Sequence, residues 1–317
     1  MPPKHTASRR QFLENAAMGS LATLAGSLAS PFSLNAVDAF NRPGKPNLKL
    51  GLAAYSLRDY FKDASHPRQN LPPESRQIDL FDFISFCADL GCEGAELTSY
   101  YFPAEISDAF LLKLKHHAFM RGVAISGTAV GNQFTDFPGK ERNEQISHVK
   151  QWIDRAAVMG APHIRVFAGN APRNESWKEA VVRCIEGLKA CCDYAAKKGV
   201  FLGIENHGGI VAEADPLIEI VKGIDSPWLG INLDTGNFHT DDPYGDLVKC
   251  APYAVNVQLK VEIAPRGQQK RPSDLPRLVN ILKEANYQGF VVLEYEAAED
   301  PWRAIPRHIE ELKPLMA

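Results

Sequence analysis

The chain has 317 residues, of which 45% are hydrophobic and 23% are charged. Its formal net charge is −3 at pH 7, and the two signs are mixed along the sequence. This balance excludes a strongly basic nucleic-acid-binding protein and gives no reason to expect an anionic membrane as a partner. The composition is that of a globular protein, and we expect one large domain.

The first forty residues differ from the rest of the chain. The paired arginine in SRRQFL, residues 8–13, precedes a weakly apolar stretch rich in Ala, Gly, Ser and Leu. This order is typical of a twin-arginine export signal, and an amphipathic helix is the alternative. We expect a signal peptide at residues 1–39, cut after Ala39, a linker at 40–46 and a periplasmic mature protein. Gly and Ser interrupt the apolar stretch, so no stable membrane insertion is expected.

From residue 47 onward, strand-like and helix-like segments alternate. Eight apolar runs predict strands at residues 49–56, 94–98, 124–129, 163–167, 201–205, 230–234, 254–260 and 290–294. Helical periodicity is clearest over 78–90, 106–121, 144–159 and 275–285. A glycine that suits a left-handed helix cap follows five helical segments, at Gly91, Gly122, Gly160, Gly199 and Gly289.

This alternation predicts an α/β fold over residues 47–317, a single (β/α)₈ barrel. A doubly wound dinucleotide-binding sheet is disfavoured because no G-x-G-x-x-G motif follows the first strand. The polar connections at 131–142 and 263–273 would be long loops on the active face. The six cysteines have no zinc or redox spacing, and we expect most of them in the core, with disulfides as the alternative.

Four apolar runs end on, or close to, a residue that is able to bind a divalent metal: Glu205, Asp234, Gln258 and Glu294. A buried carboxylate is costly unless it is paired or bound to a cation. The carboxyl ends of barrel strands gather at one mouth, so we expect these four side chains to converge. Such an oxygen-rich set suits Mn²⁺ or Mg²⁺.

Other polar residues are candidates for the same mouth. Lys260 lies two residues after Gln258 and therefore on the same side of the strand, where it would stabilise an oxyanion or form a salt bridge to Glu262 or Glu294. We expect substrate contacts from Tyr55, Glu96 and His207, with a core position as the alternative for Tyr55 and an ion pair for Glu96. Arg165 lies inside an apolar strand and needs a carboxylate, either Glu96 or Glu205, whereas His163 begins that strand and is interpreted as structural.

Five motifs together resemble a known family. They are GLAAYSLRD, LGIENH, INLDTGNF, VQLKVE and LEYE, at the first, fifth, sixth, seventh and eighth predicted strands. They are similar to those of the sugar phosphate isomerase/epimerase superfamily with the xylose isomerase-like TIM barrel, which also includes the apurinic endonuclease type 2 proteins. The resemblance covers residues 47–317.

The resemblance implies roles for the strand ends. Glu205 and Glu294 match metal-binding glutamates that also act as acid and base on opposite faces of the substrate, and Asp234 matches a metal-binding aspartate. Gln258 stands where a metal-binding histidine is usual, which favours Mg²⁺ or Mn²⁺ over Zn²⁺, with Co²⁺ as a further candidate.

A second departure lies after the sixth strand. A histidine often follows the aspartate there by three residues. Asn237 takes its place, with His239 two residues further on. We expect both Asn237 and His239 to contact the substrate.

The expected function is a metal-dependent isomerase or epimerase of a keto-sugar or cyclitol, in which a carboxylate removes a proton and the metal stabilises an enediolate. Export would favour free sugars over sugar phosphates. A lyase or dehydratase acting on a keto-sugar or 3-keto-glycoside is one alternative, and a non-catalytic sugar-binding barrel is another. An endonuclease-type hydrolase is disfavoured by Gln258 and by the negative charge. The expected partner is a small carbohydrate and not a nucleic acid, and a homo-oligomer is compatible with the sequence.

Overall fold

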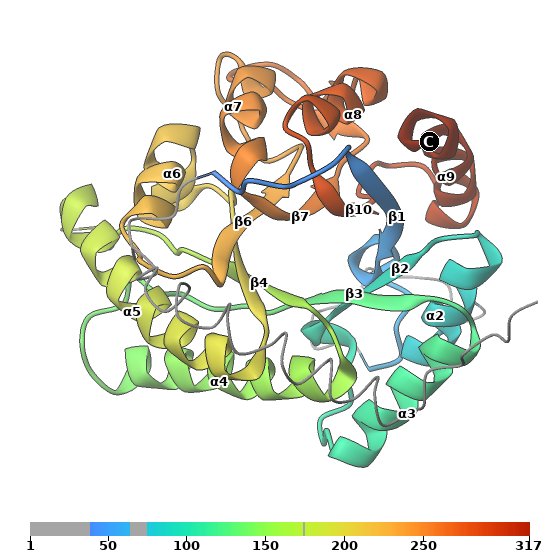
Figure 1. The fold of residues 1–317 in the computed structure, drawn as a ribbon, viewed down its shortest axis with the longest axis horizontal. Coiled ribbons are helices and arrows are strands. Elements are labelled where there is room, and N and C mark those ends of the chain that lie inside the picture. The colour runs from blue at the N-terminus through green and yellow to red at the C-terminus, as the bar shows by residue number, and fades with distance from the viewer. Residues whose placement is uncertain (1–38, 64–74, 174) are drawn as a thin grey trace, which may run out of the picture. The chain divides into compact units, whose positions relative to one another are not determined.

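The computed structural model of the protein describes residues 39–63, 75–173 and 175–317. Eight parallel strands close into one barrel in the order β1-β10-β7-β6-β5-β4-β3-β2 (Figure 1). The predicted (β/α)₈ fold is therefore confirmed. The expected signal peptide lies outside the described residues except for Ala39.

The strands and helices alternate as the sequence predicts. The barrel strands are β1 (Asn47–Ala53), β2 (Gly94–Thr98), β3 (Ala124–Ala129), β4 (His163–Phe167), β5 (Phe201–Glu205), β6 (Leu229–Asp234), β7 (Ala254–Leu259) and β10 (Gln288–Leu293). The helices are α2 (Leu80–Asp89), α3 (Asp108–Met120), α4 (Lys140–Met159), α5 (Trp177–Lys198), α6 (Ala214–Lys222), α7 (Pro243–Cys250), α8 (Leu275–Glu284) and α9 (Pro301–Met316).

Two connections differ from the expected long loops. The helix α4 begins at Lys140, so the connection after β3 ends before residue 142. The connection after β7 contains a short antiparallel pair, β8 (Glu262–Ile263) and β9 (Arg271–Pro272). Both connections follow the carboxyl ends of strands, where the mouth of the barrel lies.

Four of the five expected glycine caps are confirmed, because Gly91, Gly122, Gly160 and Gly199 have positive φ angles. Gly289 was wrongly predicted as a cap. It lies inside β10, and Asn286, with φ of 52°, takes the left-handed conformation after α8. Asparagine tolerates this conformation because its short side chain bonds locally, and here its Nδ2 donates to the carbonyl of Arg42 at 2.6 Å.

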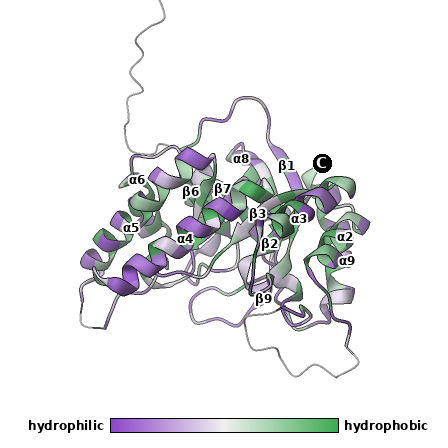
Figure 2. Ribbon diagram, turned by 90° about the horizontal axis from the view of Figure 1, so that it is seen from below, coloured by the Kyte–Doolittle hydropathy of each residue, from purple (hydrophilic) through white to green (hydrophobic). Residues whose placement is uncertain are grey.

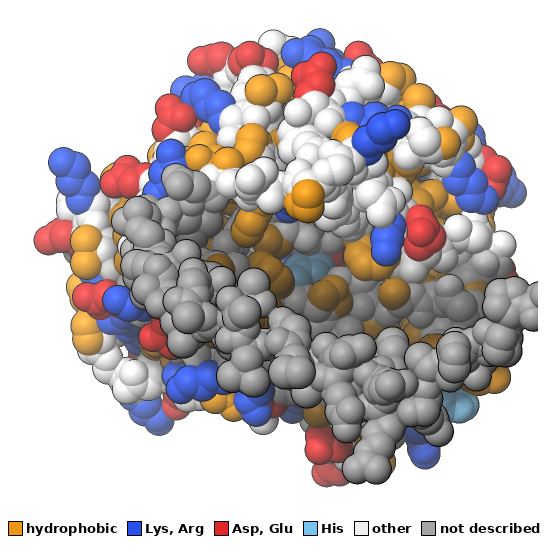
Figure 3. Space-filling model, in the orientation of Figure 1, with side chains coloured by type: hydrophobic (Ala, Val, Ile, Leu, Met, Phe, Trp, Pro, Cys, Tyr) orange, Lys and Arg blue, Asp and Glu red, His pale blue; other side chains and the backbone are white. Residues whose placement is uncertain are grey.

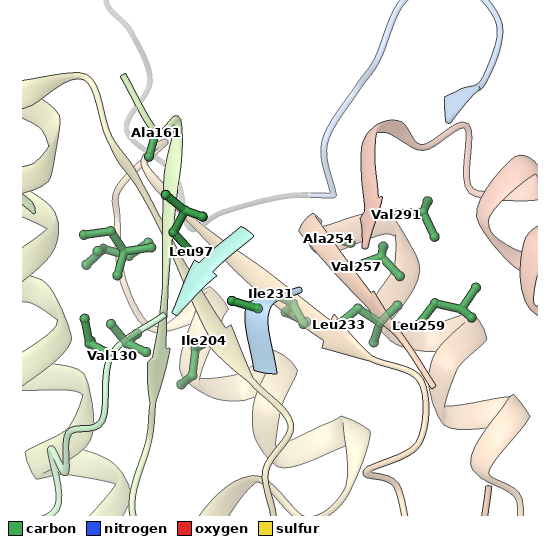
Figure 4. Packing of buried hydrophobic residues seen from close by; sticks show 14 of the residues in the cluster. Leu97, Val130, Ala161, Ile204, Ile231, Leu233, Ala254, Val257, Leu259 and Val291 are labelled. Atoms are coloured by element: carbon green, nitrogen blue, oxygen red, sulfur yellow. The ribbon is translucent and has the colours of Figure 1, made fainter. Parts of the chain in front are cut away.

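Alternating residues along the strands build two layers. Ile231 and Leu233 of β6 and Val257 and Leu259 of β7 belong to the apolar core that lies between barrel and helices (Figure 4). Figure 2 shows hydrophilic and hydrophobic residues alternating along α4 and α5, as helices with one buried face require. The residues between the apolar ones on each strand face into the barrel, and many of them are polar and buried, such as Asn232.

All six cysteines are buried and free, as expected. No helix in the described ranges is long and apolar enough to cross a membrane. On the face that Figure 3 shows, basic and acidic side chains are interspersed around the outer helices.

Candidate active site

The four predicted strand ends lie side by side. Glu205 and Asp234 are the last residues of β5 and β6, Gln258 lies next to the end of β7, and Glu294 directly follows β10. The strands β10, β7, β6 and β5 are consecutive neighbours in the barrel, and Asp234 is paired in register with Gln258. Glu205 and Glu294 therefore lie at the two ends of the row, with Asp234 and Gln258 between them.

Lys260 is the central cation of this mouth. Its Nζ lies 2.7 Å from Glu294 Oε2 and 3.5 Å from Asp234 Oδ2, and it also donates to Glu296. The expected salt bridge to Glu294 is thus present. Glu296 was missed in the sequence, although its period-two spacing from Glu294 in LEYE places both side chains on one side of the chain.

Glu205 has three polar partners. Its Oε2 lies 2.8 Å from Arg165 Nε, and its Oε1 accepts a hydrogen bond from Asn237 Nδ2 at 2.9 Å. His207 Nδ1 lies 2.9 Å from the same Oε1. Burial disfavours the charged form, but Arg165 and His207 outweigh it and hold the pKa of Glu205 below its usual value. The expectation that Arg165 pairs with a carboxylate is confirmed, and Glu205 is the partner.

Asp234 and Glu294 are also buried, but fewer hydrogen-bond donors and cations offset the cost of burying their charges than at Glu205. Asp234 Oδ1 accepts from the backbone N–H of Gly236 at 2.8 Å, whereas its Oδ2 has no hydrogen-bond donor among the described residues. The ammonium of Lys260, 3.5 Å away, is therefore only an ionic contact for Oδ2. Burial raises the pKa of Asp234 to about 8 although Lys260 opposes the shift. Burial also raises the pKa of Glu294, and the charges of Glu296 and Glu205 add to this shift, although Lys260 opposes it.

Gln258 has a different environment from that of an expected metal ligand. Its Nε2 donates to Glu96 Oε1 at 2.7 Å, and its Oε1 accepts from Asn232 Nδ2 at 2.6 Å. Both ends of the amide are therefore engaged by side chains inside the barrel. The sequence did not reveal these partners because they come from β2 and β6, far from Gln258 along the chain.

Glu96 belongs to the same interior network. Its carboxyl group is fully buried and also accepts from Asn256 Nδ2 at 2.8 Å. Burial raises the pKa of Glu96 to about 7. The bonds from Gln258 and Asn256 both lie inside the barrel, so the structure gives Glu96 a partner on each carboxylate oxygen, and its expected contact with a substrate stays a prediction.

The remaining candidates lie at the rim of the mouth. Tyr55 is half-buried, and burial, followed by the charge of Glu296, raises the pKa of its hydroxyl. His239 is exposed, with its Nδ1 3.0 Å from the carbonyl of Ala264. Asn237 and His239 line a hollow of about 60 Å³ that also contains Lys260 and Glu296. The ring of His207 packs 4.5 Å from that of Phe167, beside a second hollow of about 110 Å³.

The donor set fits a divalent cation in part. Four carboxylates, those of Glu205, Asp234, Glu294 and Glu296, face the two cations Arg165 and Lys260, which leaves a formal charge of −2. Asp234 Oδ2, which has no hydrogen-bond donor among the described residues, and this excess of negative charge suit a hard cation. Gln258 Oε1 is already engaged and does not belong to the fitting set. Within residues 39–63, 75–173 and 175–317, no three acidic, histidine or cysteine side chains are gathered at metal-binding distance.

Comparisons with known proteins agree with this architecture. A family model described as "Xylose isomerase-like TIM barrel" matches residues 84–312. No curated protein matches the chain in a sequence comparison.

Solved structures similar to this chain include sugar epimerases. The 3-keto-D-glucoside 4-epimerase of E. coli in its apo form is 17% identical, with a TM-score of 0.62 over 84% of this chain and 100% of that one. D-psicose 3-epimerase in the presence of D-fructose is 18% identical, with a TM-score of 0.64 over 83% and 89%. The IolI protein with a bound zinc atom is 17% identical, with a TM-score of 0.67 over 84% and 96%. At these identities the likeness establishes the fold.

Proposed function

Because the chain belongs to the xylose isomerase-like TIM barrel family, we propose that it is an isomerase or epimerase of a keto-sugar or cyclitol. One observation carries the proposal. The carboxylates of Glu205 and Glu294 lie at the two ends of a row of strand ends, with the strands β6 and β7 between them. A proton-transfer reaction next to a carbonyl needs a base and an acid on either side of the reacting carbon. The sugar epimerases among the similar structures support the same class of reaction.

Glu205 is the base in this proposal. Its ion pair with Arg165 favours the charged carboxylate, and the bonds from Asn237 and His207 fix the orientation of the group. The carboxylate removes a proton from the carbon next to the substrate carbonyl. Glu294 approaches from the other end of the row and returns a proton to the opposite face or to the neighbouring carbon.

Lys260 stabilises the negative charge that develops on the substrate. Its ammonium group lies 2.7 Å from Glu294 and 3.5 Å from Asp234 and also donates to Glu296, so carboxylates keep it at the mouth before the substrate binds. A preorganised cation in a water-poor site lowers the energy of an enediolate oxygen. Asn237 and His239, which line the hollow at the rim, would bond sugar hydroxyl groups.

We also propose that the site takes one divalent metal ion, with Mn²⁺ or Mg²⁺ favoured and Co²⁺ as a further candidate. Glu205, Asp234 and Glu294 would hold it, since hard cations prefer carboxylate oxygens. When bound, the ion supplies Lewis-acid stabilisation of negative charge on substrate oxygens. The zinc atom in the structure of the IolI protein supports a divalent metal in a protein of this fold.

A lyase acting on a 3-keto-glycoside is the second candidate, and one observation favours it. A hollow of about 540 Å³ opens beside Glu296, between the segments that follow β1 and β10, and it includes Tyr60 and Glu299. This hollow gives room for a group attached to the sugar ring. Elimination begins with the same proton removal, so product analysis separates the two reactions.

The test is solvent deuterium exchange. Free ketoses, inososes and 3-keto-glycosides are incubated in D₂O with the protein and Mn²⁺, Mg²⁺ or Co²⁺. We expect deuterium at a carbon next to the carbonyl, and a loss of roughly 10²–10⁴-fold in rate for Glu205→Gln and Glu294→Gln. The exposed Glu144→Gln on α4 serves as the matched control. No exchange with any keto substrate, or full exchange by both site variants, would overturn the proposal.

A further inference from the structure

Lys260 lies where the carboxylates of Asp234 and Glu294 converge. The residue is only 8% exposed, and its Nζ contacts Glu294 Oε2 at 2.7 Å and Asp234 Oδ2 at 3.5 Å. Carboxylate ligands approach a hard divalent ion to roughly 2.0–2.6 Å. The ammonium group and a metal ion bound by these two carboxylates therefore exclude each other.

The ammonium of Lys260 neutralises this cluster incompletely. With all four carboxylates ionised, a formal charge of −2 remains after Lys260 and Arg165 are counted. The fully buried Asp234 Oδ2 also lacks a hydrogen-bond donor within the described ranges. A buried charge without a donor is costly. A divalent ion would relieve both deficits, whereas the single charge of Lys260 does not.

Glu296 offers the displaced ammonium a second position. It already accepts a hydrogen bond from Lys260, and its side chain is 30% exposed, against 6% for that of Glu294. Lysine has a flexible four-carbon stem, so the ammonium can stay with Glu296 while it leaves the other two carboxylates. Glu296 also borders both hollows on this side of the mouth, which gives the ammonium space to move outward.

Gln258 provides no alternative place for a metal. Its amide oxygen accepts from Asn232 and its amide nitrogen donates to Glu96, so the side chain is fixed at both ends. A metal ion bound by both Asp234 and Glu294 must therefore take the position that Lys260 occupies.

We propose that Lys260 is the resident cation of this site and that a divalent metal ion enters only by displacing its ammonium from Asp234 and Glu294 onto Glu296. The inference rests on the proposed function only in taking these carboxylates as metal ligands. Metal binding is then a competition between the ammonium group of Lys260 and a divalent ion in solution. Removing the lysine charge therefore strengthens metal binding, even though Lys260 also serves the reaction.

The test measures Mn²⁺ binding to the metal-free protein, with free Mn²⁺ followed by electron paramagnetic resonance. Lys260→Met keeps the apolar stem and removes the charge. Lys270 lines the same hollow of about 60 Å³ as Lys260, so Lys270→Met is the matched control. We expect Lys260→Met to bind Mn²⁺ at least about tenfold more tightly than the unmodified protein, since a unit charge near the ion is removed. Lys270→Met stays within about twofold, because exposed charges are screened.

A second variant keeps the inference testable if Lys260→Met fails to fold. Glu296→Gln removes the acceptor for the displaced ammonium and is expected to weaken Mn²⁺ binding by about fivefold, as loss of a partly exposed ion pair suggests. In the Lys260→Met background the same change has no effect. The inference is overturned if the unmodified protein and Lys260→Met bind Mn²⁺ equally tightly, or if neither of them binds it. Unchanged Mn²⁺ binding by Glu296→Gln overturns it as well. If the Mn²⁺ affinities follow the expected order but no keto substrate exchanges deuterium, the proposed function is overturned instead.

Discussion

Gln258 illustrates how a single neutral side chain separates the interior of this barrel from its mouth. Its amide joins Glu96 of β2 to Asn232 of β6, and Asn256 bonds to the same two residues. These groups satisfy one another inside the barrel, where an unpaired polar atom costs free energy. The carboxylates above them pair with Lys260 and Arg165 instead. Gln258 therefore acts as a structural link below the site in this arrangement.

We expect Gln258→Ala to lower the free energy of unfolding by about 2–4 kcal/mol, because it leaves Glu96 Oε1 and Asn232 Nδ2 buried without these partners. Urea denaturation measures the change, and Mn²⁺ affinity should stay within about twofold because Gln258 is not counted among the ligands. The exposed Gln268→Ala is the control, with a change below about 0.5 kcal/mol. Unchanged stability together with a large loss of Mn²⁺ affinity would instead identify Gln258 as a ligand.

At the scale of elements, the strands β3 and β4 meet through a glycine and a histidine. A Cβ atom on Gly127 of β3 would overlap the imidazole ring of His163 on β4. That ring is buried, and its Nδ1 lies 3.0 Å from the carbonyl of Ser126. The missing side chain of Gly127 thus makes room for the ring that links the two strands.

We expect Gly127→Ala to destabilise the protein by about 3 kcal/mol, since overfilling a packed core forces neighbouring groups to move. His163→Ala in the same chain removes the ring that the new methyl group meets. The free energy of unfolding of the double variant should therefore exceed, by at least about 1 kcal/mol, the value obtained by adding the effects of the two single changes. Chemical denaturation of the four proteins gives this coupling energy. Strict additivity would show that the two residues do not share the space.

The same histidine gives the fold a pH dependence. Burial lowers the pKa of His163 from 6.5 to about 4. The unfolded chain therefore binds the proton more readily, so the stability from neutral His163 is complete above pH 6.5 and is lost as the pH falls toward 4. We expect the difference in unfolding free energy between the unmodified protein and His163→Gln to narrow by about 3 kcal/mol from pH 7 to pH 4. A difference in unfolding free energy that stays constant from pH 7 to pH 4 would contradict a lowered pKa for His163.

At the scale of the whole molecule, local sequence patterns were sufficient to predict the barrel and one side of the site. Apolar runs placed all eight strands, and the polar residues at their ends identified Glu205, Asp234, Glu294 and Lys260 as neighbours. The partners of Gln258 were not predictable, because Glu96 lies 162 residues away along the chain. A contact across a barrel depends on strand register and closure, which no local pattern encodes.

The N-terminal edge of the described fold lies at the predicted cut site. The backbone N–H of Phe40 donates to the carbonyl of Pro252 at 3.0 Å, and its ring lies edge-on to that of Phe201 at 6.5 Å. The guanidinium of Arg42 lies 5.0 Å from the Phe40 ring centroid. Anchoring contacts with the barrel are thus present at the residue that directly follows the predicted cut after Ala39. A mature chain that begins at Phe40 would retain them.

From the arginine pair in the sequence we expect export by the twin-arginine route, followed by cleavage between Ala39 and Phe40. This route carries folded proteins, and its recognition requires the arginine pair. Replacing Arg9 and Arg10 together by lysine keeps the charge and should retain the full-length chain in the cytoplasm. Cell fractionation with mass spectrometry of the N-terminus measures both the location and the cut, and a host strain without the twin-arginine pore is the control. Export of the double-lysine variant, or export from the control strain, would contradict the route, and a mature N-terminus far inside the barrel sequence would contradict the cut, because such a chain would lose the contacts of Phe40 with Pro252 and Phe201.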